Sequence, residues 1–359
     1  MTRPHPVGRM LTGSYGNDMT ATPPTSETVH RDRELPLRAG APISEIGIQV
    51  LCMAAVLTVM IAFTAAKDAK FLGLYQMQTT GREVAILSIF AIGQGIVIIA
   101  GGIDLSVGSV LCFVGTLAIY LMNNSPLPVG AIIALAMLFA VAVGIVHGLL
   151  ICYLNLPPFI VTLCSLLLWR SLGRWLSDDM TVGFQATDQP FFAWLGNGRI
   201  GPVPFPVVLV AIVGALAIFL MRGTVHGRYL YAIGYNLEAA RFSGVRVNAL
   251  RIFTYGFCGF LTGIAGLIDA SSVSSVAPSS AGTLYELYGI TSAVLGGCAL
   301  SGGQGSIIGI VIGAAILKVL YKALLFLGVS SLLTDAVTGL VLLGAVLTDA
   351  LIKKRRATR

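Results

Sequence analysis

The chain has 359 residues, of which 56% are hydrophobic and only 11% are charged. Soluble globular proteins carry about 25% charged residues, so a water-soluble fold of this chain would expose mostly hydrocarbon and would aggregate. The composition therefore excludes a soluble enzyme, a disordered protein and a disulfide scaffold. We predict an all-α, polytopic membrane protein.

The two ends of the chain differ from the rest. Residues 1–45 hold Pro, Ser, Thr and five arginines but no long apolar run, which predicts a disordered cytoplasmic tail. They lack the apolar centre and cleavage site of a signal peptide. Residues 353–359 form a short basic tail, also expected in the cytoplasm. The transmembrane domain should therefore cover residues 46–352.

From residue 46 onward, apolar stretches follow one another, most of them long enough to cross roughly 30 Å of hydrocarbon. Few residues separate the second stretch from the third. The eighth is interrupted by Thr, Ser and Gly, so it could be broken or re-entrant. We expect ten spans, at 46–66, 83–101, 103–122, 128–151, 158–176, 204–221, 250–270, 283–300, 306–327 and 331–352.

The basic residues predict the orientation. The N-terminal tail, the link between the sixth and seventh spans and the C-terminus each hold five. With ten spans all three lie on one side, which the positive-inside rule makes cytoplasmic. The net charge of +7 thus marks topology rather than nucleic-acid binding. The other side carries an acidic loop with Asp178, Asp179 and Asp188.

The spans contain few groups that could perform chemistry. Gradient-driven transporters usually place ionisable residues near mid-membrane, but here His147 and Arg170 are isolated, and no span holds a convincing carboxylate pair. Lys318, Lys322 and Asp269 are expected toward span ends. The chain has no Gly-Lys dipeptide, hence no phosphate-binding loop. We predict a transport subunit without enzymatic activity or cofactor, whose energy comes from another chain.

The six cysteines form no C-x-x-C pair and lie in or beside apolar runs. This pattern favours small buried hydrophobes over a metal site or disulfides.

Residues 223–251, between the sixth and seventh spans, are too polar to cross the membrane. Asn236 can cap a helix, Glu238 suits its first turn, and Gly244 can end it. We predict a short helix over 237–243 with Ala239 and Ala240 on a small, close-packing face. It is either a connector on the membrane surface or a rigid knob that inserts into a partner, and its ordered length favours the knob.

Four segments resemble a known family. Glu238-Ala239-Ala240 followed by Gly244 resembles the E-A-A-x-x-x-G motif of permease subunits of ATP-binding-cassette importers. The ribose/galactose/xylose branch of that family has segments similar to four further stretches of this chain: GRYLYAIGYN, which precedes the motif, GGIDLSVGS, PPFIVTL, and LGG with LSGG. The four segments are thus 227–244, which includes the E-A-A motif, 101–109, 157–163, and 295–303 with LGG at 295–297 and LSGG at 300–303.

The resemblance implies a function. It implies a permease in a bacterial inner membrane that imports a monosaccharide or related polyol, with ATP hydrolysed on separate ATPase subunits. A periplasmic or extracellular solute-binding protein would deliver the cargo, and a second permease copy, identical or paralogous, would complete the pathway. Coupling to the ATPases would fall on Asn236, Glu238, Ala239, Ala240 and Gly244.

Other residues have two interpretations. Gly101 and Gly102 allow a tight reversal, after which Asp104 or Ser106 either caps the next helix or, for Asp104, contacts substrate. Neutral groups within the spans could line a route for polyhydroxy solutes, or they could bond neighbouring helices and their own backbone. These are Gln94, Asn155, Thr162, Thr262, Ser165, Thr254 and Thr291. Glycine pairs four residues apart, such as Gly144/Gly148 and Gly259/Gly263, should allow close helix packing.

Two alternatives remain open. The chain could be a self-contained secondary transporter or facilitator, although the scarcity of buried ionisable groups argues against it. It could also be a permease of the same family for amino acids or nucleosides, because the sequence does not name the cargo.

Overall fold

We analysed a computed structural model of the chain. It describes residues 43–185 and 187–330, together with residues 333, 335–337, 339, 340, 343 and 344. The two predicted tails, apart from the first residues of α1, and most of the tenth predicted span lie outside these residues.

The described part is almost entirely helical, as predicted. Its eight helices that are long and apolar enough to cross a membrane correspond to the first seven predicted spans and the ninth. They are α1 (Ile43–Lys67), α2 (Leu74–Ile99), α3 (Val107–Asn124), α4 (Val129–Tyr153), α5 (Pro158–Leu176), α7 (Phe205–Ile218) continued by the π-helical turn η2 (Phe219–Gly223), α10 (Val247–Val273) and α12 (Ile307–Phe326).

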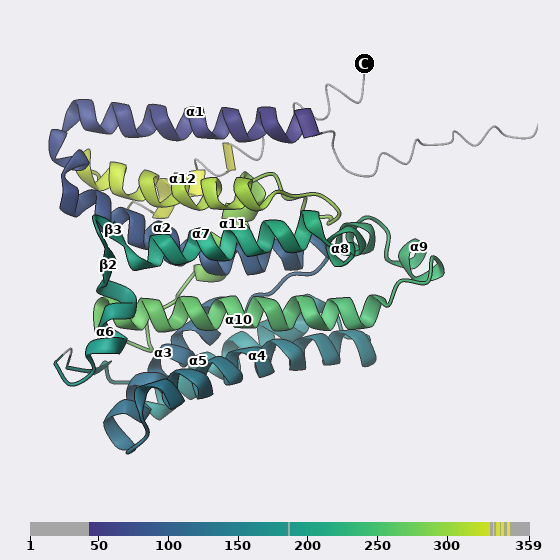
Figure 1. The fold of residues 1–359 in the computed structure, drawn as a ribbon, viewed down its shortest axis with the longest axis horizontal. Helices are drawn as coiled ribbons and strands as arrows, with labels where there is room; N and C mark the ends of the chain where they lie inside the picture. The colour runs from purple at the N-terminus through teal and green to yellow at the C-terminus, as the bar shows by residue number, and fades with distance from the viewer. Residues whose placement is uncertain are drawn as a thin grey trace, which may run out of the picture. The chain divides into compact units, whose positions relative to one another are not determined.

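Shorter elements lie at the ends of these helices. One end carries α8 (Val225–Tyr235) and α9 (Leu237–Phe242), and the opposite end carries α6 (Pro190–Asn197) and the strand β2 (Figure 1). We call these the α9 end and the α6 end. The remaining short elements are the 3-10 turn η1 (Ala69–Leu72), α11 (Tyr285–Leu295), and two antiparallel pairs, β1 (Val182–Gly183) with β4 (Ser275–Val276) and β2 (Arg199–Ile200) with β3 (Val203–Pro204).

Helix α2 forms the centre of the packing. In the most apolar 18-residue stretch of α2, 83% is buried inside the protein, whereas the corresponding share in α1 is 6%. Helices α7, α10, α11 and α12 pack on α2, α4 and α3 pack on α10, and α1 lies along α12 (Figure 1). The exposed apolar faces of α1, α4 and α5 suit contact with lipid, because hydrocarbon replaces water around them.

The glycine pairs bring helices close together, as predicted. A Cβ built on Gly144 of α4 would overlap the Tyr255 carbonyl of α10, and one built on Gly259 of α10 would overlap the Ala140 carbonyl of α4. Glycines therefore act here as packing residues that let two backbones touch.

The eighth crossing is broken rather than continuous. Helix α11 has only 11 residues, or roughly 16 Å at 1.5 Å per residue. The chain nevertheless traverses the bundle, because β4 pairs with β1 near the α6 end while the Gly303 amide donates to the Ile99 carbonyl near the α9 end, 2.9 Å away. The predicted eighth span over 283–300 therefore contains one short helix, which agrees with the broken alternative of the prediction.

Arg170 explains how irregular backbone is tolerated at this depth. Its guanidinium donates to the carbonyls of Pro278 (3.2 Å) and Ala281, in the irregular stretch before α11. Backbone polar groups inside a membrane protein must be satisfied by the protein itself. The isolated cation in the fifth predicted span therefore has a structural partner.

The cysteines only partly follow the prediction. All six are free, and Cys112, Cys152, Cys258 and Cys298 are buried, but Cys52 and Cys164 are exposed on the surfaces of α1 and α5. In a membrane these faces meet hydrocarbon, where a thiol behaves as a small apolar group.

Candidate functional site

Helix α9 has the capping predicted from sequence. The Asn236 side chain accepts a hydrogen bond from the Ala239 amide at 2.9 Å. Glu238 lies in the first turn and pairs with Arg241 at 3.3 Å, and Gly244 follows the helix with φ +79°. The observed helix covers Leu237–Phe242, one residue shorter than the predicted 237–243.

The exposed face of α9 differs from the prediction at one alanine. Ala239 is exposed, but Ala240 is only 5% exposed and belongs to the hydrophobic core. The face that a partner could reach instead carries Phe242, which is 87% exposed, beside exposed Glu238 and Ala239. Sequence reasoning missed Phe242, although an aromatic residue in a short polar helix was the available signal.

Behind α9, the C-terminal end of α8 packs tightly between two glycine-containing loops, one after α2 and one before α12. A Cβ on Gly234 would overlap the carbonyl of Ile99, the last residue of α2, and the Gly303 amide before α12. The Tyr231 hydroxyl adds a hydrogen bond to the Gly305 carbonyl at 3.0 Å. Two of the motif segments, 101–109 and 300–303, therefore meet at the base of α9.

Asp104 stabilises the turn that leads into α3. Its Oδ1 accepts hydrogen bonds from the amide (2.8 Å) and hydroxyl (2.6 Å) of Ser106, and its carbonyl accepts one from Gln94 Nε2 at 2.8 Å. Gly101 supplies the left-handed φ of +77° that the reversal needs. Gly102 packs beneath the Tyr255 hydroxyl. Asp104 acts here as a turn-forming residue, with the formal N-cap of α3 at Ser106.

A buried imidazole lies beside Asp104. His147 Nε2 is 2.7 Å from the Ser165 hydroxyl, and its Nδ1 is 3.9 Å from Asp104 Oδ2. No described residue makes a hydrogen bond with Nδ1. A cavity of about 10 Å³ adjoins Asp104, His147 and Thr262, which is close to the space that one water needs.

Most of the predicted pathway residues bond the protein itself. Thr162 and Thr262 are buried and donate to carbonyls of their own helices, Pro158 (2.9 Å) and Cys258 (2.8 Å), and Gln94 is used on Asp104. Asn155 lies outside the spans, exposed in the loop between α4 and α5 with φ +52°. The expectation that Asn155 is a group within a span is therefore wrong.

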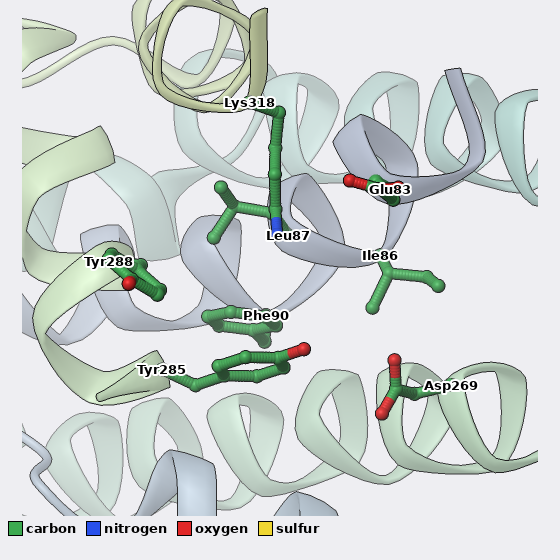
Figure 2. Close-up of a pocket in the computed structure, with 8 residues that line it drawn as sticks. All are labelled: Glu83, Ile86, Leu87, Phe90, Asp269, Tyr285, Tyr288 and Lys318. Carbon is green, nitrogen blue, oxygen red and sulfur yellow. The ribbon is translucent and has the colours of Figure 1, made fainter. Parts of the chain in front are cut away.

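Charged residues of different helices meet inside the bundle, although no single predicted span holds a convincing carboxylate pair. A cavity of about 30 Å³ toward the α6 end is lined by Glu83 of α2, Asp269 of α10 and Lys318 of α12, with Tyr285 of α11 (Figure 2). Beside it, Lys322 Nζ is 2.6 Å from Glu83 Oε1. These residues come from distant parts of the chain, so inspection of each span by itself could not find the cluster.

Comparison with known proteins identifies the family. Residues 78–346 match the family described as branched-chain amino acid transport system / permease component. The chain belongs to this family. It is therefore a multi-pass membrane permease component of a transport system rather than an enzyme, as the four motif segments indicated.

Several relatives are import permeases. Over 296 residues the chain is 38% identical to the ribose import permease protein RbsC of Escherichia coli, covering 82% of this chain and 91% of the relative. It is 32% identical to the xylose transport system permease protein XylH of Haemophilus influenzae (87% and 99% covered) and to the autoinducer 2 import system permease protein LsrC of Salmonella paratyphi B (82% and 84% covered). No solved structure matches significantly.

Proposed function

We propose that this chain is the membrane-spanning permease subunit of an ATP-binding-cassette importer for a monosaccharide or related polyol. The names of its relatives, import permeases for ribose and xylose, support the cargo class. The observation that carries the coupling role is α9 itself, a capped, exposed helix whose base is held against the ends of α2 and α12. A helix anchored in this way can pass a push from outside the membrane into the transmembrane helices.

In this proposal the ATPase subunits bind at the α9 end, which lies in the cytoplasm together with both termini. Phe242 would insert into an apolar pocket of the ATPase while Glu238 and Ala239 set its angle. Large exposed aromatics of this kind commonly dominate interface energies. When the ATPases close, α9 and α8 would move together, and the Gly234 contact would tilt α2 and α12.

The solute-binding protein would dock at the α6 end. Phe191 and Trp194 of α6 are exposed there, next to a loop that carries acidic residues. Arg174 donates two hydrogen bonds to Asp179 (2.8 and 2.7 Å), which lower the pKa of that carboxyl below its usual value and keep it charged. The same aromatic residues also suit an amphipathic cap at the membrane surface. A second permease copy would complete the pathway.

The coupling role is tested by Ala239→Trp and Phe242→Ser in the complete importer. Phe242→Ser should reduce co-purification of the ATPase subunit by about 30-fold, the effect of losing one interface hot spot of about 2 kcal/mol. Ala239→Trp adds bulk to the same face and should also weaken co-purification, and uptake should fall in both variants. Phe191→Ser, at the opposite end, is the matched control for ATPase binding. Unchanged ATPase association and uptake in both α9 variants would refute the role of α9.

The cargo and the energy source need two further measurements. Cells that contain the permease, its ATPase and its binding protein should accumulate at least one of D-ribose, D-xylose and D-fructose. This accumulation should stop when ATP is depleted. Liposomes that contain the permease alone should take up none. Uptake by the permease alone would instead identify a facilitator, and uptake of amino acids or nucleosides in place of sugars would correct the cargo class.

A further inference from the structure

The cavity shown in Figure 2 is the strongest unexplained site in the described part of the chain. Four helices, α2, α10, α11 and α12, supply its walls, and it lies inside the bundle toward the α6 end. Charged residues at this depth are costly and usually mark a pathway or a binding site. Neither the α9 coupling surface nor the turn at Asp104 uses any of its residues.

Several polar groups of the cavity are not committed to the protein. Within the described residues, no hydrogen bond and no ion pair closer than 4 Å engages the Asp269 carboxylate or the Lys318 ammonium. The Lys318 Nζ lies 5.8 Å from the centroid of the Tyr285 ring. The Tyr285 hydroxyl points toward Asp269 in Figure 2 and makes no hydrogen bond with a described residue. A strong hydrogen-bond acceptor, a strong donor and a hydroxyl thus face one cavity without hydrogen bonds to the described residues.

Glu83 differs from these groups because Lys322 already holds it. The 2.6 Å ion pair fixes one wall of the cavity, whereas Asp269 and Lys318 make no such direct ion pair among the described residues. The two lysines balance the two carboxylates, so the site has no net charge when all four are ionised. A neutral site with both signs of charge suits a neutral ligand that can donate and accept hydrogen bonds.

The aromatic wall narrows the ligand class further. Tyr285 stacks on Phe90 with ring centroids 5.6 Å apart and an interplanar angle of 10°, and this flat pair borders the cavity (Figure 2). A sugar has hydroxyl groups around its rim and an apolar C–H face, so it could meet the charged groups and the rings at once. An inorganic ion would use only the charged groups.

We propose that this cavity is a hydroxyl-binding site of the permease, at which Asp269, Lys318 and Tyr285 hold a monosaccharide during its passage. The inference rests on the proposed function and adds a cargo-contacting site within this chain. The present volume of about 30 Å³ accommodates about two waters. The state described here thus has room for about two hydroxyl groups, so binding of a whole sugar requires a second state in which this cavity is wider.

Direct binding to the purified permease tests the site. Saturation-transfer difference NMR would be recorded with D-ribose, D-xylose and D-fructose at millimolar concentration, using whichever sugar the complete importer carries. Asp269→Asn should weaken binding about tenfold or more, because it removes a charged hydrogen-bond acceptor. Tyr285→Phe removes one oxygen atom and should weaken binding by several fold.

Asp68→Asn provides the matched control, because it makes the same chemical change outside the cavity and outside the acidic loop of the proposed docking surface. Retained size-exclusion profiles and melting temperatures establish that the variants are folded. In the complete importer, the two cavity variants should lower the maximal uptake rate while ATPase association stays normal.

The inference and the proposed function fail in different ways. If the complete importer carries none of the three sugars, the proposed cargo class is wrong. Suppose instead that the importer carries one of them. The cavity is then not a cargo site, and the importer function stands, if the purified wild-type permease does not bind that sugar or if Asp269→Asn and Tyr285→Phe bind it as well as the wild type does.

Discussion

The imidazole Nε2 of His147 lies 2.7 Å from the Ser165 hydroxyl, and this buried contact joins α4 to α5. Both side chains are at least nine-tenths buried. On the other side of the ring, Nδ1 faces Asp104, the residue that shapes the turn into α3. One histidine thus connects two lipid-facing helices to the glycine-rich motif near the α9 end.

Replacing Ser165 with Ala should destabilise the protein modestly. Interhelical hydrogen bonds in membrane proteins contribute about 0.6 kcal/mol on average and about 1.7 kcal/mol at most, so we expect a loss in this range and a lower melting temperature in detergent. Ser88→Ala is the control, because the Ser88 hydroxyl is fully buried and has no partner among the described residues. Its removal should be neutral or stabilising, and an equal loss in both variants would contradict the role of the histidine contact.

Helix α9 should depend on its cap. Asn236→Ala removes the acceptor of the Ala239 amide, which costs about 0.5–2 kcal/mol. The amides of residues 237–242 should then exchange with deuterium about 2- to 30-fold faster, and ATPase co-purification should weaken. Asn236→Asp keeps an acceptor at the same position and should retain slow exchange. Fast exchange in both variants would show that the cap does not hold the helix.

The close contact of Gly234 with the ends of α2 and α12 should transmit motion from α9 rather than bind a partner. Gly234→Ala places a methyl group against the Ile99 carbonyl and the Gly303 amide, so α8 must shift away from α2 and α12. We expect normal ATPase association, because the exposed face of α9 is unchanged, together with uptake reduced by tenfold or more. Gly214→Ala in α7 meets nothing within 4 Å and should leave uptake unchanged. Loss of ATPase association in Gly234→Ala would instead mean that α8 shapes the docking surface.

Local patterns in the sequence predict much of this architecture. The apolar stretches locate the eight long helices, and the Asn, Glu and Gly positions locate α9, because hydrophobic length and capping are properties of neighbouring residues. The burial of Ala240 cannot be predicted from neighbouring residues, since it depends on how α9 lies against the core.

The charged cavity could not be predicted for the same reason. Glu83 and Lys322 lie in the second and ninth predicted spans, which are far apart in the sequence. Their pairing follows from the packing of α12 on α2, which no pattern within a single span encodes. The carbonyl partners of Arg170 depend in turn on the irregular stretch before α11.

The contact between α4 and α10 gives a prediction for folding that is independent of function. Gly144→Ala would overlap the Tyr255 carbonyl and force the two helices apart, and overpacking of this kind typically costs about 1–3 kcal/mol. We expect a lower yield of folded protein and a lower melting temperature. Gly130→Ala makes the same change at the start of α4, where the added methyl meets nothing within 4 Å, and it should be neutral or slightly stabilising. Because the two variants share a helix and a substitution, equal stability would show that α4 and α10 are not in backbone contact.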